Sequence, residues 1–110
     1  MEGDPHHGNK WMPIMYVTYF GMLKEIAESK GYCLSVHGSV TRDFDLIAIP
    51  WTEVPSSHEE LLKAFRDCIE INVGEPYDSM CVKPGGRIAY TIMSGGGGYL
   101  DISITPFVSI

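Results

Sequence analysis

Residues 34–51 read LSVHGSVTRDFDLIAIPW and consist of two apolar runs separated by a polar segment. Short apolar runs bounded by turn-forming residues are typical of strands. Pro50 cannot donate a ladder hydrogen bond and constrains Ile49 to an extended backbone, so the second run is expected to end there. The stretch therefore predicts two strands, Cys33 to Val36 and Phe44 to Ile49, joined by a polar turn.

The polar segment from His37 to Asp45 contains a Gly-Ser pair, an arginine and two closely spaced aspartates. Side chains alternate along a strand, so Asp43 and Asp45 are expected to emerge together on one face of the sheet. The apolar residues that alternate with them are expected on the other face: Phe44, Leu46 and Ala48. This concentration of polar groups between two apolar strands makes the segment the candidate functional site.

The chain has 110 residues, enough for one domain with its own core. Its 45% hydrophobic and 20% charged residues and its mean hydropathy of +0.01 are typical of a globular protein. No apolar run approaches the ~20 residues that a transmembrane helix needs. The polar start MEGDPHHGNKW does not resemble a secretory signal. We therefore expect a cytoplasmic protein with a flexible arm at residues 1–11 and a single domain at residues 12–110.

The formal net charge is −6, and only eight residues are Lys or Arg. A chain without a basic cluster cannot neutralise a run of backbone phosphates, which argues against duplex nucleic acid as a partner. A single phosphorylated small molecule, held through a metal ion or a few amides, is compatible with this charge. The widely spaced Cys33, Cys68 and Cys81 lack metal-ligand spacing, which predicts reduced thiols. The composition does not indicate an oligomeric state.

The first predicted helix begins at Pro13, because proline suits a first-turn position, and ends before Gly31, which suits a left-handed C-cap. Apolar residues recur along it at helical spacing and form one face. That face consists of Tyr16, Val17, Phe20, Leu23, Ile26 and Ala27. We expect it to pack on a sheet.

A second helix is predicted to begin after Ser57, because Ser57 and Glu60 form a capping box. This helix is expected to extend to about Asn72. Its apolar stripe consists of Leu61, Leu62, Phe65, Cys68 and Ile69. The charged residues between them are expected to be solvated: Glu59, Glu60, Lys63, Arg66 and Asp67. Neither these residues nor His58 indicates a function.

Residues 73–86 are rich in Gly and Pro and are expected to form a loop. Two further strands are predicted at Arg87 to Met93 and Tyr99 to Thr105, joined by a hairpin turn at Gly95 to Gly98. In the last strand, Asp101 alternates with apolar neighbours. The element order is helix, strand, strand, helix, strand, strand. It predicts an α+β fold in which two helices cover one face of a four-stranded sheet.

Burying an unpaired carboxylate costs several kcal/mol, so an acid within a strand must be exposed, paired or bound to a cation. Asp43, Asp45 and Asp101 on one open face would suit Mg²⁺ or Mn²⁺, which take a few carboxylate oxygens and leave positions for water and phosphate. Simpler interpretations remain open. Asp43 could pair with Arg42 or Arg87, or cap its turn, and a histidine after an apolar run is often structural.

A hydrophobic strand ending in Gly-Ser, an Asp-x-Asp on the next strand and a lone Asp within a later apolar strand together resemble the signature of the nucleotidyltransferase superfamily. The resemblance implies transfer of a nucleotidyl group to a hydroxyl, with a divalent cation supplying most of the electrostatic stabilisation. It also implies roles for particular residues. Nucleotide phosphates would lie against Gly38 and Ser39, metal would bind Asp43, Asp45 and Asp101, and the pocket would also be lined by His37 and Arg42.

The segment HGSVTRDFDLIAIPW and the late YLDIS strand also resemble small uncharacterised proteins of bacteriophages, which implies a bacterial host cell. In active superfamily members a longer segment, usually beginning a short helix, separates the Gly-Ser from the first acid. Here only Val40, Thr41 and Arg42 separate Ser39 from Asp43. This spacing favours an alternative, a non-catalytic protein that sequesters a nucleotide signal of host defence. A structural or protein-interaction domain is the third hypothesis.

Overall fold

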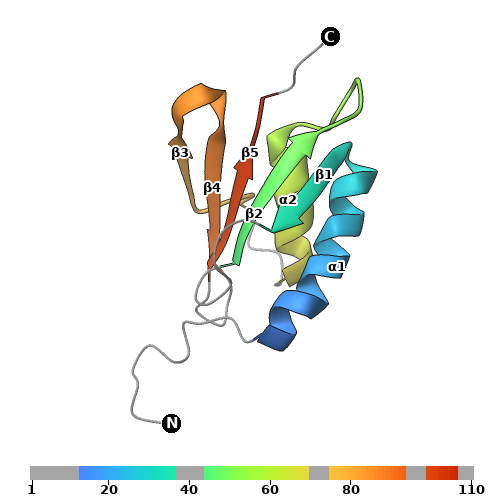
Figure 1. The fold of residues 1–110 in the computed structure, drawn as a ribbon. Coiled ribbons are helices and arrows are strands. Elements are labelled where there is room, and N and C mark those ends of the chain that lie inside the picture. Colours follow the sequence, from blue (N-terminus) through green and yellow to red (C-terminus); the bar gives the residue numbers. More distant parts are fainter. Residues whose placement is uncertain (1–12, 37–43, 70–74, 94–98, 107–110) are drawn as a thin grey trace.

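The computed structural model describes residues 13–36, 44–69, 75–93 and 99–106 (Figure 1). The described elements form an α+β fold and follow the predicted order, with one additional strand and a short 3-10 turn. In chain order they are α1 (Pro13–Ser29), β1 (Tyr32–Val36), β2 (Phe44–Pro50), α2 (His58–Ile69), β3 (Ser79–Val82), η2 (Pro84–Gly86), β4 (Ile88–Met93) and β5 (Tyr99–Ile104). The predicted N-terminal arm at residues 1–11 lies outside the described residues.

The sheet has five strands in the order β1-β2-β5-β4-β3. The last strand, β5, lies between β2 and β4, parallel to β2 and antiparallel to β4. The expected four-stranded sheet was wrong because Ser79–Val82 forms a fifth strand within the predicted loop. All four residues of β3 are exposed. The strand therefore has no buried face, and apolar alternation, the pattern that predicts a half-buried strand, does not identify it. Pairing with β4 defines this strand.

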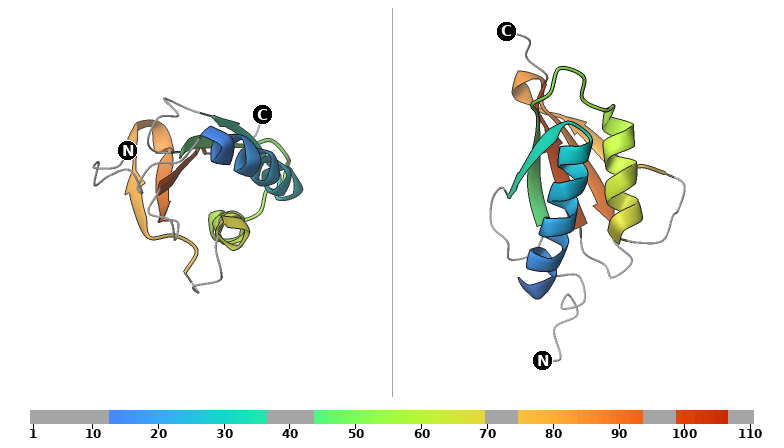
Figure 2. Two further views of the ribbon diagram at one scale, coloured as in Figure 1. Left: turned by 90° about the horizontal axis from the view of Figure 1, so that it is seen from below. Right: turned by 90° about the vertical axis from the view of Figure 1, so that its right-hand side faces the viewer.

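Both helices cover the same face of the sheet, as predicted; in the right-hand view of Figure 2 they lie in front of it. The alternation predicted for β2 and β5 is confirmed, because every second residue of each strand is buried against the helices. These residues are Phe44, Leu46, Ala48, Leu100, Ile102 and Ile104. The described residues place no helix on the opposite face of the sheet (Figure 1). We call it the open face, and it carries the side chains that alternate with the core residues, including those of Asp45 and Asp101.

Helix α1 packs through the predicted apolar face. Leu23 and Ala27 are fully buried, and Phe20 and Ile26 pack at the edge of the core. The side chains of Tyr16 and Val17 lie outside the described residues. As predicted, Gly31 follows the helix in the left-handed region, with φ of 91°.

Replacing Gly31 by alanine is expected to destabilise the protein by about 2–4 kcal/mol. A Cβ atom here would lie 2.5 Å from Thr52 Oγ1 and 2.9 Å from the Cα of Pro55, and the positive φ adds strain. Urea unfolding of Gly31→Ala measures the loss. Gly21→Ala is the matched control: nothing lies within 4 Å of its Cβ, and alanine favours a helix, so this variant should gain stability. Equal effects of the two substitutions would contradict the explanation.

The predicted capping box at the start of α2 is confirmed. The Ser57 amide donates to Glu60 Oε1 at 3.1 Å, and the Glu60 amide donates to Ser57 Oγ at 3.2 Å. The described part of the helix ends at Ile69, and its predicted continuation to Asn72 lies outside the described residues. All three cysteines are free thiols.

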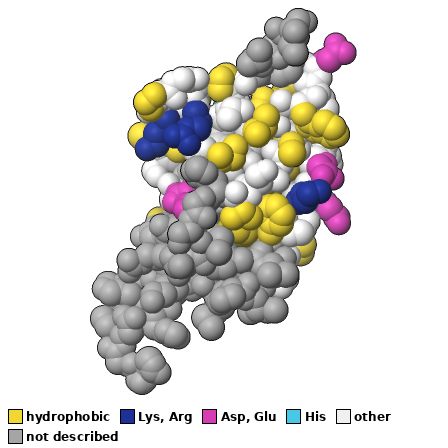
Figure 3. All heavy atoms as spheres, in the orientation of Figure 1, with side chains coloured by type: hydrophobic (Ala, Val, Ile, Leu, Met, Phe, Trp, Pro, Cys, Tyr) yellow, Lys and Arg dark blue, Asp and Glu magenta, His cyan; other side chains and the backbone are white. Residues whose placement is uncertain are grey.

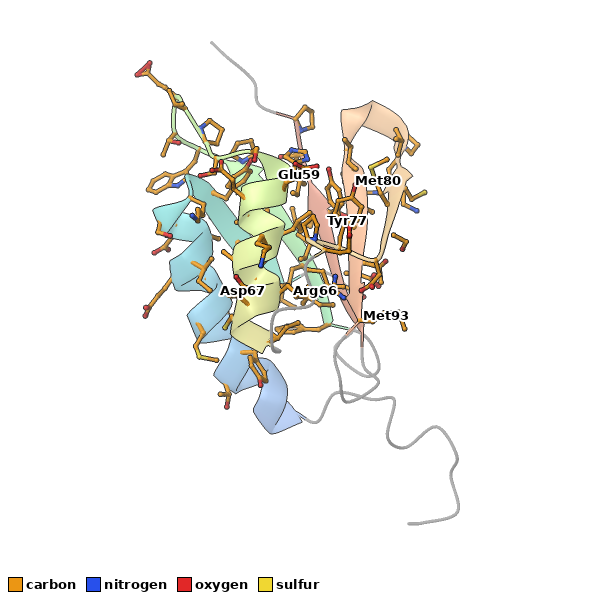
Figure 4. The ribbon with its side chains drawn as sticks, turned by 180° about the vertical axis from the view of Figure 1, so that it is seen from behind. Glu59, Arg66, Asp67, Tyr77, Met80 and Met93 are labelled. Atoms are coloured by element: carbon orange, nitrogen blue, oxygen red, sulfur yellow. The ribbon has the colours of Figure 1, made fainter. Side chains whose placement is uncertain are left out.

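The expectation that Arg66 is solvated was wrong, because its side chain is buried with only 4% of the residue exposed. Its Nη2 donates to Asp78 Oδ2 at 2.7 Å, and its Nη1 donates to the Glu75 carbonyl oxygen at 3.0 Å. Figure 4 shows Arg66 between α2 and the end of β4 near Met93. Asp78 Oδ2 also accepts the Met93 amide at 2.7 Å. The pair therefore joins α2 to the base of the β3–β4 hairpin.

Candidate functional site

A groove of about 400 Å³ runs along the open face over β2, β5, β4 and β3. Small side chains at Ala89, Ser79 and Ser103 leave space between longer ones, so the sheet surface is hollowed there. The lining residues are Asp45, Ser79, Met80, Cys81, Lys83, Arg87, Ala89, Thr91, Asp101 and Ser103. The groove is therefore polar, and charged residues of both signs line it.

Asp45 and Asp101 lie side by side in the groove. They are Cα partners in the parallel register between β2 and β5, and adjacent strands are only about 4.8 Å apart. Their neighbours in each strand face the core, so both carboxylates project from the open face. The structure thus brings together the acid of the first hairpin and the acid of the last strand, as the sequence predicted.

Thr91 holds one of these acids. It lies opposite Asp101 in the β4–β5 register, and its hydroxyl donates to Asp101 Oδ1 at 2.8 Å. Among the described residues, the other carboxylate oxygen of Asp101 has no hydrogen-bond partner. Thr91 was not among the predicted site residues; pairing the predicted strand ends Met93 and Tyr99 places it across from Asp101.

The two carboxylates form an acidic pair on a partly buried surface. Like charges at adjacent positions of neighbouring strands are destabilising, and a cation between them would replace this repulsion by attraction. Carboxylate and hydroxyl oxygens are hard ligands that suit Mg²⁺ and Mn²⁺. Within the described ranges, no group of three or more His, Cys, Asp or Glu residues could hold a metal ion. Many Mg²⁺ sites use only one or two protein carboxylates and leave the other positions for water and phosphate.

The opposite end of the groove is basic. Lys83 and Arg87 flank η2, and the Lys83 amide donates to the Arg87 carbonyl oxygen at 2.8 Å, which closes the turn between them. Arg87 Nη1 lies 3.5 Å from Ser103 Oγ. In Figure 3, Lys and Arg side chains gather over the β3–β4 hairpin, while acidic surface lies further along the same face. This basic end was not predicted from the sequence, in which Arg87 was expected only as a possible ion-pair partner of Asp43.

Five predicted site residues lie outside the described residues: His37, Gly38, Ser39, Arg42 and Asp43. The predicted turn at Gly95–Gly98 also lies outside them, although the antiparallel pairing of β4 with β5 confirms the hairpin. The described part of the predicted site therefore consists of Asp45 and Asp101, to which the structure adds Thr91, Lys83 and Arg87.

A second polar cluster lies on the helix side of the sheet. His58 Nδ1 is 2.7 Å from the Tyr90 hydroxyl oxygen, and the rings of Tyr77 and Tyr90 are 4.8 Å apart. Burial lowers the pKa of His58 below its ordinary value and raises that of Tyr90. Both groups are thus uncharged at neutral pH. Tyr90 points away from the open face, so this cluster packs α2 against β4 and does not reach the groove.

None of the described helices is long and apolar enough to cross a membrane. Comparison of the chain with protein-family models, with curated proteins and with solved structures finds no match.

Proposed function

We propose that the open face binds a divalent cation, Mg²⁺ or Mn²⁺, at Asp45 and Asp101, and that the bound cation holds a nucleotide or another phosphorylated ligand. One observation carries this proposal: the parallel register of β2 and β5 pairs the two acids on the open face. A groove beside them offers room for a ligand. Thr91 restrains the carboxylate of Asp101, which lowers the entropy cost of holding a cation there.

Nucleotidyl transfer is the reaction that the sequence resemblance favours at such a site. The resemblance would add Asp43 as a third acid, and Gly38 and Ser39 as contacts to phosphate. A bound cation would stabilise the negative charge that develops on the reacting phosphate. The chain itself would supply the positions of the carboxylates and the walls of the groove.

Binding without turnover is the second candidate, and the short spacing between Ser39 and Asp43 favours it. Three residues are too few for a helix whose N-terminus could receive the phosphate. A protein that binds a nucleotide tightly and releases no product would act by sequestering it, as expected for a bacteriophage protein directed against a host nucleotide signal.

Calorimetric titration with MnCl₂, followed by nucleoside triphosphates in the presence and absence of Mg²⁺, tests both candidates. We expect Mn²⁺ to bind and nucleotide binding to require the divalent cation. Chromatography of the nucleotide after incubation with hydroxyl acceptors then separates them, since a transferred nucleotidyl group supports the enzyme and unchanged nucleotide supports sequestration. A protein that binds neither Mn²⁺ nor nucleotide would overturn the proposal and leave a structural or interaction role.

A further inference from the structure

We propose that Lys83 and Arg87 form an anion subsite at the basic end of the groove. The ligand is then a chain of two or more phosphates, such as a nucleoside di- or triphosphate, rather than a single phosphate. This inference rests on the proposed cation site, because that site fixes where the phosphate chain begins.

The spacing of the two ends of the groove supports a chain of phosphates. Ser103, which Arg87 contacts, is on the same face of β5 as Asp101 and two residues further along it. Two residues of a strand span about 7 Å. A chain of phosphates that begins on a cation at Asp101 would bring more than one phosphate oxygen within reach of the Arg87 guanidinium beside Ser103. The next phosphates of a linear chain extend in that direction along the groove.

Lys83 and Arg87 differ in their ion pairing from three other basic residues, Lys24, Lys63 and Arg66. Lys24, Lys63 and Arg66 each form an ion pair with an acid, at 2.6, 3.0 and 2.7 Å respectively. Within the described part of the chain, neither Lys83 nor Arg87 has such an acid partner. Both side chains are nevertheless partly buried in the groove wall. Two basic side chains that line the same end of a groove, without an ion-pair partner among the described residues, favour binding of an anion there.

The two residue types suit different parts of this task. The planar guanidinium of Arg87 can donate two parallel hydrogen bonds to phosphate oxygens, whereas the ammonium of Lys83 acts as a mobile point charge. Without a metal ion, the acids and bases of the groove balance in formal charge. With a divalent cation at Asp45 and Asp101 the groove becomes positive, so we expect polyphosphate binding to depend on the cation.

The test compares three inorganic probes on the full chain: Mn²⁺ alone, orthophosphate with Mg²⁺ and tripolyphosphate with Mg²⁺. In the Lys83→Gln, Arg87→Gln double variant, tripolyphosphate should bind roughly 100-fold more weakly, about tenfold for each lost charge-assisted contact. The affinity for Mn²⁺ should stay close to that of the wild type, and the affinity for orthophosphate should fall much less than that for tripolyphosphate. Arg87→Lys keeps the charge but loses the paired donors, and should give an intermediate loss. Lys24→Gln removes one positive charge from α1, away from the groove, and should have no effect.

The outcomes separate this inference from the proposed function. If tripolyphosphate affinity is unchanged in the double variant, or if orthophosphate is weakened equally, the subsite is overturned while Mn²⁺ binding still supports the cation site. If the wild type binds tripolyphosphate but no Mn²⁺, and the double variant loses that binding, the cation site fails and the subsite stands. Melting temperatures of all variants verify that each protein is folded.

Discussion

Replacing Asp101 by asparagine is expected to lower the affinity for Mn²⁺ by at least about 100-fold, more than the loss typical of changing a residue that only supports a ligand. Asparagine keeps the shape of the side chain and an acceptor for the Thr91 hydroxyl, but it removes one of the two negative charges that face the groove. The same loss is expected for Asp45→Asn, its register partner on β2.

The stability of the metal-free protein should change in the opposite direction. Because Asp45 and Asp101 repel each other across neighbouring strands, Asp101→Asn should increase the free energy of unfolding by up to about 1 kcal/mol. Added MnCl₂ should then raise the melting temperature of the wild type but not that of the variant.

Calorimetry with Mn²⁺ and thermal unfolding with and without MnCl₂ measure both effects. Asp67→Asn is the matched control, because this exposed acid on α2 pairs with Lys63 on the helix surface, away from the groove. Its Mn²⁺ affinity should equal that of the wild type. Wild-type affinity in both Asp45→Asn and Asp101→Asn would show that Mn²⁺ binds elsewhere, and the proposed site would have to be abandoned.

Asp78→Ala is expected to destabilise the fold by about 2–3 kcal/mol, less than the loss of one partner from a fully buried ion pair, because 34% of the Asp78 side chain is exposed while Arg66 is buried. The guanidinium of Arg66 is almost fully buried and would lose its hydrogen bond and ion pair with Asp78, while its bond to the Glu75 carbonyl oxygen would remain. The Met93 amide would lose its acceptor as well. Arg66→Met should cost less, since it removes the buried charge and leaves Asp78 partly exposed to water. Urea unfolding of both single variants and the double variant measures the coupling between the two residues.

The pH dependence of stability provides a second measurement on Asp78. Burial raises the pKa of this carboxyl, but hydrogen bonds from the Met93 amide and from Arg66, together with the charge of Arg66, bring it below its ordinary value of 3.8. A lowered folded-state pKa contributes stability that is fully present above the unfolded pKa and is lost as the pH falls through the folded pKa. Wild-type stability should therefore decrease below about pH 4. Asp78→Ala should lack this part of the decrease, and parallel acid profiles of the two proteins would contradict the assignment.

The same ion pair affects the candidate site, because Asp78 immediately precedes β3. Its backbone amide also donates to the Thr91 carbonyl oxygen at 2.8 Å. Through Arg66 the base of the hairpin is fixed to α2, and the hairpin carries Lys83 and Arg87 at its other end. The pair therefore supports the basic side of the groove as well as the fold.

The sequence by itself determined the features that depend on neighbouring residues. Helical spacing of apolar residues identified both helices, and the capping box at Ser57 and the left-handed Gly31 followed from local backbone chemistry. Strict alternation along β2 and β5 indicated which side chains face the core, and hence that Asp45 and Asp101 are on the other side.

Only the tertiary structure decided the features that depend on residues far apart in the chain. Insertion of β5 between β2 and β4 set the register that pairs Asp45 with Asp101, and no local pattern encodes such a pairing. The exposed edge strand β3 forms only through its hydrogen bonds to β4. In the sequence, the position of Arg66 on its helix is that of a solvated residue. Its burial depends on the contact with Asp78, 12 residues further along the chain. Backbone propensity and periodicity act over a few residues, whereas strand register and buried ion pairs arise when distant segments pack together, and these set both the acidic and the basic ends of the groove.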